Sequence, residues 1–176
     1  MYRNIITLTL LLCSISKSLC QNDLRTYKIL NDDVSVQVPD NLIEMSEEMF
    51  QYKYGMNQKP SFVVSNEDGT VNFIANLSNM SLAENNLIEY RTRHLSKLMK
   101  SRSDIEVSEV GEKDVNGKQI VYFKFLTQAI DQKIFNYYFF TVYKGKLLMF
   151  TFNTIEVLKE EWEKKADNIL LSIKIK

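Results

Sequence analysis

The sequence predicts an α+β fold, a three-layer α/β/α sandwich built around a mostly antiparallel sheet. The first observation is a run of four strand patterns between residues 105 and 152, separated by short turn signals. The second is that two of these strands, 135–143 and 146–152, are apolar on both faces, so the sheet needs cover on both sides. The third is a set of three helical segments, two of them amphipathic, that can supply this cover.

The composition is that of an ordinary globular protein and indicates one domain at residues 21–176. The chain has 176 residues, of which 45% are hydrophobic and 25% are charged. Residues 1–20 contain two bases and no acid, so residues 21–176 carry 20 basic and 22 acidic side chains, a net charge of −2. This balance lacks the basic footprint of a nucleic-acid-binding protein.

Residues 1–20 have the pattern of a cleavable signal peptide. Arg3 supplies a positive start, residues 5–12 form a mostly apolar run, and a more polar stretch follows. The run is less than half of the roughly twenty apolar residues that a membrane-spanning helix needs. Cleavage would leave Leu19 or Gln21 as the first residue. The alternative interpretation is a buried N-terminal helix or strand.

Cys20 offers another interpretation of the N-terminus. A cysteine just after an apolar run can be acylated and become the first residue of a lipoprotein, which is the one membrane attachment that the sequence suggests. Lys17 and Leu19 depart from the small residues that normally precede such a cysteine. Because Cys13 and Cys20 both lie in the signal segment, no disulfide is expected in the domain.

A strand region and a short helix are predicted at the start of the domain. Residues 27–38 alternate between apolar and polar side chains, which is typical of one or two strands with one buried face. Ser46 is expected to be the N-cap of a helix that runs to about Tyr54, where Gly55 ends it.

A hairpin and a long helix are predicted next. An Asp-Gly pair is expected to join strands at 61–65 and 71–77. Ser81 and Glu84 have the spacing of a capping box, which predicts a helix from there to about Lys100.

The meander begins with a strand at 105–115, whose Ile105, Val107 and Val110 are expected to point inward. An Asn-Gly pair follows and is typical of a type I′ hairpin turn. A later strand divides its side chains between the two sheet faces, with Phe135, Tyr137, Phe139 and Tyr143 on one face and Tyr138, Phe140 and Val142 on the other.

The last element is an amphipathic helix at 157–172, with Asn153 or Thr154 as its N-cap. We expect this helix and the long helix to cover one face of the sheet, and the short helix to cover the other.

Four segments carry a likeness to a known family. They are an opening strand with its proline, a short helix, the entry to the aromatic meander and a closing helix, at residues 34–40, 45–48, 111–117 and 162–174. This order of elements resembles the PsbP-like family. One departure is visible, because Leu42 and Ile43 stand where these sequences often carry tryptophan.

The resemblance implies a fold that small exported bacterial proteins share with the photosystem protein PsbP and a Ran-binding nuclear import factor. The family has no common catalytic residues. Its members mostly bind other proteins or are uncharacterised, so the resemblance supports the fold more than the function.

No set of residues with catalytic, cofactor-binding or metal-binding chemistry is predicted. His94 is the only histidine and would lack the partners of a base or zinc ligand, so a position on the surface or flank of its helix is expected. The paired acids at 32–33 and 47–48 belong at a turn and a helix start. The loop at 66–70 lacks the spacing of a calcium-binding loop. Neither a Gly-x-Ser-x-Gly elbow nor a glycine-rich phosphate loop occurs.

Two groups of aromatic residues are candidates for binding. Tyr122, Tyr137, Tyr138 and Tyr143 could line a ligand pocket, although their spacing also fits core packing. The candidate partner surface surrounds the short helix, and its alternative interpretation is that the same side chains pack this helix onto the sheet. Its residues are Met45, Met49, Phe50, Tyr52, Tyr54 and Met56.

These observations favour an exported, non-enzymatic binding or accessory protein that contacts an unidentified protein partner at the cell envelope. This hypothesis predicts an exposed apolar or aromatic patch. An alternative is a carrier of a small apolar ligand, which needs an enclosed cavity of several hundred Å³ between sheet and helices. A hydrolase with an atypical carboxylate pair is a further alternative. The sequons at Asn76 and Asn79 would matter only in a eukaryotic host.

Overall fold

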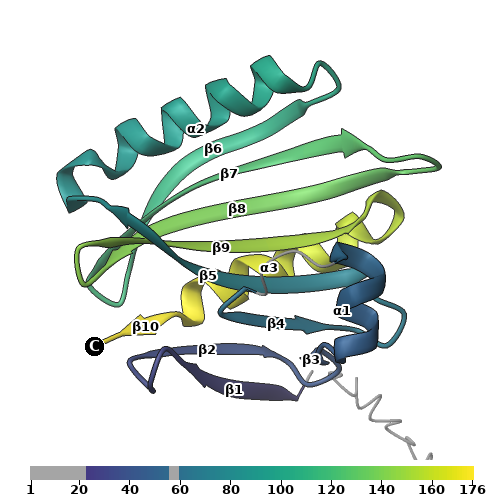
Figure 1. The fold of residues 1–176 in the computed structure, drawn as a ribbon, viewed down its shortest axis with the longest axis horizontal. Coiled ribbons are helices and arrows are strands. Elements are labelled where there is room, and N and C mark those ends of the chain that lie inside the picture. The colour runs from purple at the N-terminus through teal and green to yellow at the C-terminus, as the bar shows by residue number, and fades with distance from the viewer. Residues whose placement is uncertain (1–22, 56–59) are drawn as a thin grey trace, which may run out of the picture.

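The computed structural model describes residues 23–55 and 60–176 (Figure 1). The predicted signal peptide, with Cys20, lies outside these residues, as does Met56 of the predicted partner surface. Within them, a large antiparallel sheet carries a packed core on each face, which confirms the predicted α+β sandwich.

The large sheet has seven strands, namely β3 (Ile43–Glu44), β4 (Phe62–Ser65), β5 (Val71–Ser81), β6 (Glu106–Val115), β7 (Lys118–Gln128), β8 (Lys133–Tyr143) and β9 (Lys146–Ile155). Their order across the sheet is β3-β4-β5-β9-β8-β7-β6, and every neighbouring pair is antiparallel. The predicted meander is therefore confirmed as the four consecutive strands β6 to β9.

A second, smaller sheet is formed by β1 (Leu24–Ile29), β2 (Val34–Pro39) and β10 (Lys174–Ile175), with β2 in the middle. The strand region predicted at 27–38 is thus two strands, joined by a tight turn in which residues 30–32 have positive φ. β10 brings the end of the chain back to pair with the start of β2.

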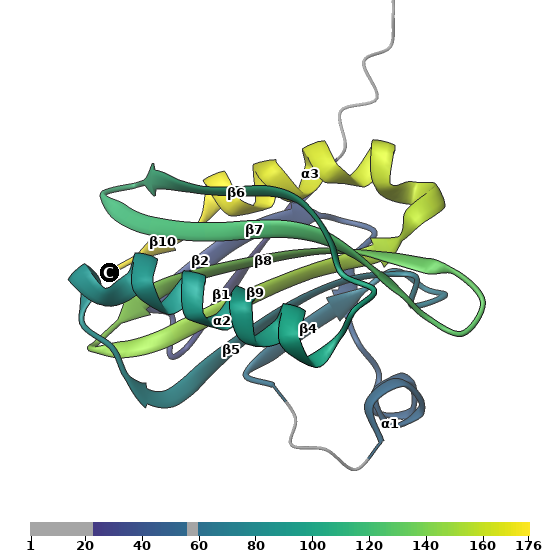
Figure 2. The ribbon, with the colours of Figure 1, turned by 90° about the horizontal axis from the view of Figure 1, so that it is seen from above.

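Within the described residues, three α-helices cover the large sheet, namely α1 (Glu47–Tyr54), α2 (Leu87–Ser101) and α3 (Lys159–Ser172). α3 and the small sheet lie on one face, whereas α1 and α2 lie on the other (Figure 1, Figure 2). The expectation that α2 and α3 share a face was wrong. An amphipathic pattern marks which side of a helix is buried, but not which face of the sheet it covers. α3 is held on its face because β10, directly after it, pairs with β2.

The two faces of the meander carry the side chains that the alternation predicts. The face under α3 and the small sheet buries Phe135, Tyr137, Phe139 and Tyr143, together with Trp162 of α3. The face under α2 buries Phe140 and Val142, and Tyr138 packs against them. A third, smaller cluster lies beneath α1 and contains Met45, Phe50 and Val63.

Several local signals are confirmed. The Ser46 side chain accepts a hydrogen bond from the Met49 amide at 3.1 Å and caps α1, and Gly55 ends that helix with a φ of 65°. Asn116 and Gly117 have φ values of 53° and 78°, as a type I′ turn requires.

Two predicted helix caps were wrong. Ser81 is the last residue of β5 and pairs with Lys146, and the helical turn before α2 starts after Ala83. Asn153 and Thr154 lie inside β9. Strand pairing reaches Ser81 and extends past Asn153 and Thr154, so in both places a tertiary contact outweighs the local capping preference.

The inward orientation predicted for Val107 and Val110 was also wrong, because both side chains are exposed. They lie on β6, the edge strand of the sheet, whereas α2 packs mainly against β7 and β8. Among the described residues, no helix is long and apolar enough to cross a membrane.

Candidate binding pocket

The residues predicted as a partner surface divide into buried and exposed members. Met45 and Phe50 are buried, and with Val63 they form the small core beneath α1. Met49 and Tyr54 are half-buried against that core. Tyr52 is 86% exposed and faces solvent. Met45 and Phe50 thus pack the short helix onto the sheet, which is the alternative interpretation. Among the described members, only Tyr52 exposes most of its side chain to a partner.

The candidate pocket tyrosines are packed in the core rather than around a cavity. Tyr122, Tyr137 and Tyr143 are buried, and each hydroxyl donates to a carboxylate. The acceptors are Glu109 at 2.7 Å, Asp167 at 3.1 Å and Asp33 at 2.5 Å, in that order. These bonds satisfy the polar tips that a ligand would otherwise use.

Lys124 is a buried lysine among three carboxylates. Its Nζ lies 2.9 Å from Glu109, 3.1 Å from Glu163 and 3.3 Å from Asp167, and its side chain is 4% exposed. Burial by itself lowers the pKa of Lys124, but the hydrogen bonds and charges of the carboxylates outweigh it and hold that pKa well above the ordinary value. Lys124 is therefore an ammonium ion at physiological pH, and it joins α3 to β6 and β7 rather than acting as a nucleophile.

Lys53 differs from Lys124, because its environment lowers the pKa of the ammonium instead of raising it. Partial desolvation of the ammonium lowers its pKa, although the Lys53 side chain as a whole is exposed. Its Nζ donates to the Gly69 carbonyl and to Asn72 Oδ1 (3.0 Å), and Asn72 in turn donates to Asn153 Oδ1 at 2.9 Å. This chain of hydrogen bonds crosses from α1 to β5 and β9, so it is a structural connection within the sandwich.

His94 lies on the flank of α2 among aromatic rings. It stacks on Tyr90 with ring centroids 5.6 Å apart and meets Phe140 edge-on at 5.4 Å. Burial, and to a smaller extent the charge of Lys97, lowers the pKa of the imidazole. No group of three potential metal ligands occurs within residues 23–55 and 60–176.

Two of the acidic residues that the sequence analysis weighed, Asp33 and Asp68, hold structural positions in turns. Asp33 accepts hydrogen bonds from Lys144 and Tyr143, which lower its pKa. In the hairpin at 66–70, Asp68 accepts from the hydroxyl and amide of Thr70, which lowers the pKa of Asp68 as well. Both carboxylates stabilise turns.

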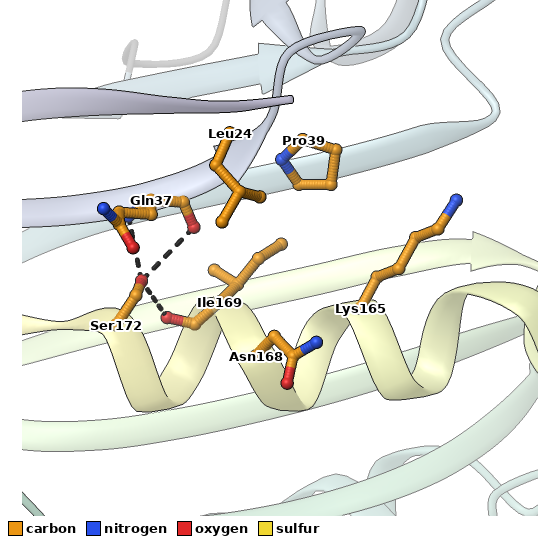
Figure 3. Close-up of a pocket in the computed structure, with 7 residues that line it drawn as sticks. All are labelled: Leu24, Gln37, Pro39, Lys165, Asn168, Ile169 and Ser172. Carbon is orange, nitrogen blue, oxygen red and sulfur yellow. Dashed lines mark hydrogen bonds between the residues drawn. The ribbon is translucent and has the colours of Figure 1, made fainter. Parts of the chain in front are cut away.

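A pocket of about 250 Å³ lies at the seam between the small sheet and α3. Figure 3 shows Leu24 and Pro39 on one side and the α3 side chains on the other. The buried Ile169 contributes an apolar floor. Gln37, Lys165, Asn168 and Ser172 supply polar groups around it.

Ser172 closes one end of this pocket and completes the edge of β2. Its hydroxyl accepts from the Gln37 amide at 2.8 Å and lies within donating distance of the carbonyls of Ile169 (2.7 Å) and Gln37 (3.2 Å) (Figure 3). A side chain of α3 thus takes the place of a neighbouring strand just before β10 begins. Pro39, two residues further along β2, has no backbone N–H and therefore needs no hydrogen-bond acceptor there.

The remaining polar groups of the pocket are available to a ligand. The side-chain amides of Gln37 and Asn168 make no hydrogen bond to another described residue. Lys165 pairs with Glu161 at 2.6 Å and lies over the Trp162 ring, 4.3 Å from its centroid. Because Glu161 is largely exposed, this pair is easily exchanged for another carboxylate.

A larger hollow of about 630 Å³ lies beside the β4–β5 turn. Among the described residues, its lining comes from loop residues and the short β3, with Ile43 as the one apolar side chain beside Asn41, Asn66, Glu67 and Asp68. It lacks a buried apolar floor, so the seam pocket is the better candidate site.

Sequence reasoning missed the seam pocket entirely. Its lining comes from residues 24–39 and 165–172, which come together only because β10 returns to β2. No spacing or motif within either segment signals this contact. Exposed Leu24, at the first position of β1, is the one local hint, since an aliphatic side chain at an exposed strand start has no core role.

Comparison with known proteins shows the same fold in several solved structures. The sequence matches no known family profile and no curated protein. Cyanobacterial PsbP (CyanoP) from Synechocystis sp. PCC 6803 is similar with a TM-score of 0.63 and 13% identity, over 90% of this chain and 96% of that chain. LpqN of Mycobacterium tuberculosis, a protein involved in cell envelope biogenesis, has a TM-score of 0.57 and 9% identity, over 81% and 82% of the chains.

A third structure, the Pseudomonas aeruginosa protein of unknown function PA94, has a TM-score of 0.56 and 12% identity over 87% of this chain and 97% of that chain. At these identities the likeness concerns the fold and leaves the function open. The chain therefore has the PsbP-like fold that its sequence resembles.

Proposed function

We propose that this protein is exported and acts without catalysis as a binding or accessory protein at the cell envelope, through contacts with another protein. The observation that carries the proposal is the seam pocket between β2 and α3, an open hollow with an apolar floor and unpaired amides at its rim. Such a hollow suits one aliphatic side chain of a partner. The side-chain amides of Gln37 and Asn168 at its rim can then form hydrogen bonds with the partner's backbone.

The size of the pocket favours a protein partner over a free small molecule. Pockets for small molecules usually enclose about 300–1,000 Å³ and bury most of the ligand. The seam pocket has about 250 Å³ and is lined by exposed residues on both sides. A hollow of this kind instead resembles the anchor pocket at the centre of a protein–protein interface.

The packing between the sheet and its helices does not favour the carrier alternative. The aromatic side chains of β7, β8 and β9 fill the space under α3 and under α2. Three of the four tyrosines that would line a carrier cavity, Tyr122, Tyr137 and Tyr143, already donate to carboxylates.

The ionisable groups support a role without catalysis. Lys124 remains protonated, its three carboxylates are engaged with it, and His94 lies among aromatic rings with Tyr90 as its hydrogen-bond partner at 3.3 Å. None of these groups is arranged as a nucleophile with an adjacent base. Export is supported by the apolar run at residues 5–12, which is typical of a signal peptide.

Site-directed photo-crosslinking in the native host tests this function. A photoreactive phenylalanine derivative at Asn168, on the rim, is expected to give a recurrent crosslink to one protein. The same group at Lys164, exposed on α3 outside the pocket, serves as the control. Leu24→Trp should fill the pocket and abolish the crosslink. A crosslink that survives Leu24→Trp, or the absence of any recurrent crosslink from Asn168, contradicts the proposal.

A further inference from the structure

One helix of this protein carries a net positive charge. Residues 87–102 contain five bases and one acid, a net charge of +4 in a domain whose residues 21–176 carry −2. The rest of the domain is therefore acidic, and α2 is a local basic ridge. Arg102, just after the helix, is paired with Asp104 at 2.6 Å and adds little free charge to the ridge. The helix dipole favours cations at a helix C-terminus. It does not explain Arg93, which lies two turns before the end of α2.

Most of these bases are not engaged in strong ion pairs. Arg93 lies 3.6 Å from Glu89, and both side chains are about two-thirds exposed. Lys97 and Lys100 are exposed and form no ion pair with any described residue. Arg91, by contrast, donates to the Gly111 carbonyl at 2.8 Å and is part of the fold. The free cations thus lie on the outward side of α2.

Exposed aliphatic side chains lie at the same end of the molecule. Met99, in the last turn of α2, is 50% exposed, and Ile130, in the β7–β8 turn, is fully exposed. Arg102 connects the two segments, because its guanidinium donates to the Gln128 carbonyl at 2.8 Å. Figure 1 and Figure 2 both show the end of α2 and the tip of the β7–β8 hairpin at one end of the sheet.

We propose that α2 and the β7–β8 turn form a docking surface for an anionic lipid bilayer. The free cations would lie at the level of the phosphate groups, and Met99 and Ile130 would enter the interface between headgroups and acyl chains. α2 is a convex ridge, and its aliphatic side chains are isolated tips between cations rather than a continuous patch. A flat, negatively charged, deformable surface fits that shape better than a protein groove does.

This surface and the seam pocket face opposite directions. α2 covers one face of the large sheet, and the pocket lies in the layer on the other face (Figure 2). A molecule docked through α2 would present its pocket away from the bilayer, where a partner can reach it. The lipid contact does not depend on the pocket, so either inference can fail while the other holds.

Vesicle co-sedimentation tests the proposal with protein that starts at Gln21, which keeps every described residue and omits the apolar leader. We expect binding to vesicles of phosphatidylglycerol mixed with phosphatidylcholine, weakening as salt rises, and little binding to phosphatidylcholine alone. Lys97→Glu/Lys100→Glu should weaken binding by more than about tenfold, since each cation near the surface contributes about fivefold. Ile130→Asn should weaken it severalfold.

Lys164→Glu/Lys174→Glu is the matched control, because it makes the same charge change at exposed positions away from α2. Its binding should stay within about twofold of the wild-type value, because only the local charge of α2 is expected to matter. Equal losses in the two double variants would overturn the proposal in favour of a non-specific effect of net charge. Failure of the wild-type protein to sediment with phosphatidylglycerol vesicles would overturn it as well, and would leave an acidic protein as the class of partner for the ridge.

Discussion

Gly111 of β6 and Tyr122 of β7 are direct cross-strand partners, and the tyrosine ring lies over the glycine. A Cβ at position 111 would lie 2.5 Å from the Tyr122 hydroxyl and 2.6 Å from the ring carbon that carries it. The absence of a side chain at 111 therefore permits the tyrosine to reach Glu109, to which it donates at 2.7 Å. Glu109 is also a partner of Lys124, so this glycine supports the whole ion cluster beneath α3.

Gly111→Ala is expected to lower the free energy of unfolding by about 1–3 kcal/mol, because the ring must move and overpacking costs energy of this size. Chemical denaturation measures the change. In the double variant Gly111→Ala/Tyr122→Leu, the loss caused by the alanine should largely disappear, since the atoms it meets are gone. If the alanine is equally costly in the wild-type and Tyr122→Leu backgrounds, the two side chains do not interact and this account of the glycine is wrong.

Lys124→Met should destabilise the protein by about 3 kcal/mol, because it leaves three carboxylates close together without their shared cation. These carboxylates are partly exposed, so the cost falls at the lower end for a buried ion pair. Lys165→Met is the control, since its pair with Glu161 lies on the surface of one helix and should contribute less than about 1 kcal/mol. Urea denaturation of both variants provides the comparison, and similar losses would contradict a special role for Lys124.

These contacts show where sequence reasoning succeeds and where it fails. The faces of β8 and the turn at Asn116 depend on neighbours along the chain, so alternation and turn chemistry predict them. The exposure of Val107 depends on the position of β6 at the edge of the sheet, which is a property of the whole topology. The seam pocket depends on the contact of Ser172 with Gln37, 135 positions apart in the chain, and no local pattern carries that information.

His94 is expected to make stability depend on pH above the range in which carboxylates titrate. Burial lowers its pKa in the folded protein below the ordinary value of 6.5, so the unfolded chain binds the proton first as pH falls. The free energy of unfolding should therefore decrease as pH falls through about 6.5 and level off below the folded pKa. Thermal melts between about pH 7.5 and 5.5 measure this slope, which is set by the difference in bound protons.

His94→Gln is expected to flatten the stability profile in that pH window, because glutamine does not titrate. Asp33 and Asp104 have lowered pKa values, so their stabilisation is lost only at more acidic pH, below the ordinary range of aspartate. A variant with the same slope as the wild-type protein would show that another group causes the dependence.

The residues around α1 provide a test that separates packing from partner contact. Phe50→Ala should destabilise the protein by about 3 kcal/mol, because the ring is 2% exposed in the core beneath α1. Tyr52→Ala should change stability by no more than about 0.5 kcal/mol, because the side chain is exposed and supports no core contact. Crosslinking yield to a partner, measured beside stability, then decides the role of this surface. A loss of partner crosslinks in Tyr52→Ala at unchanged stability would extend the partner interface to α1, whereas unchanged crosslinks would confine it to the seam pocket.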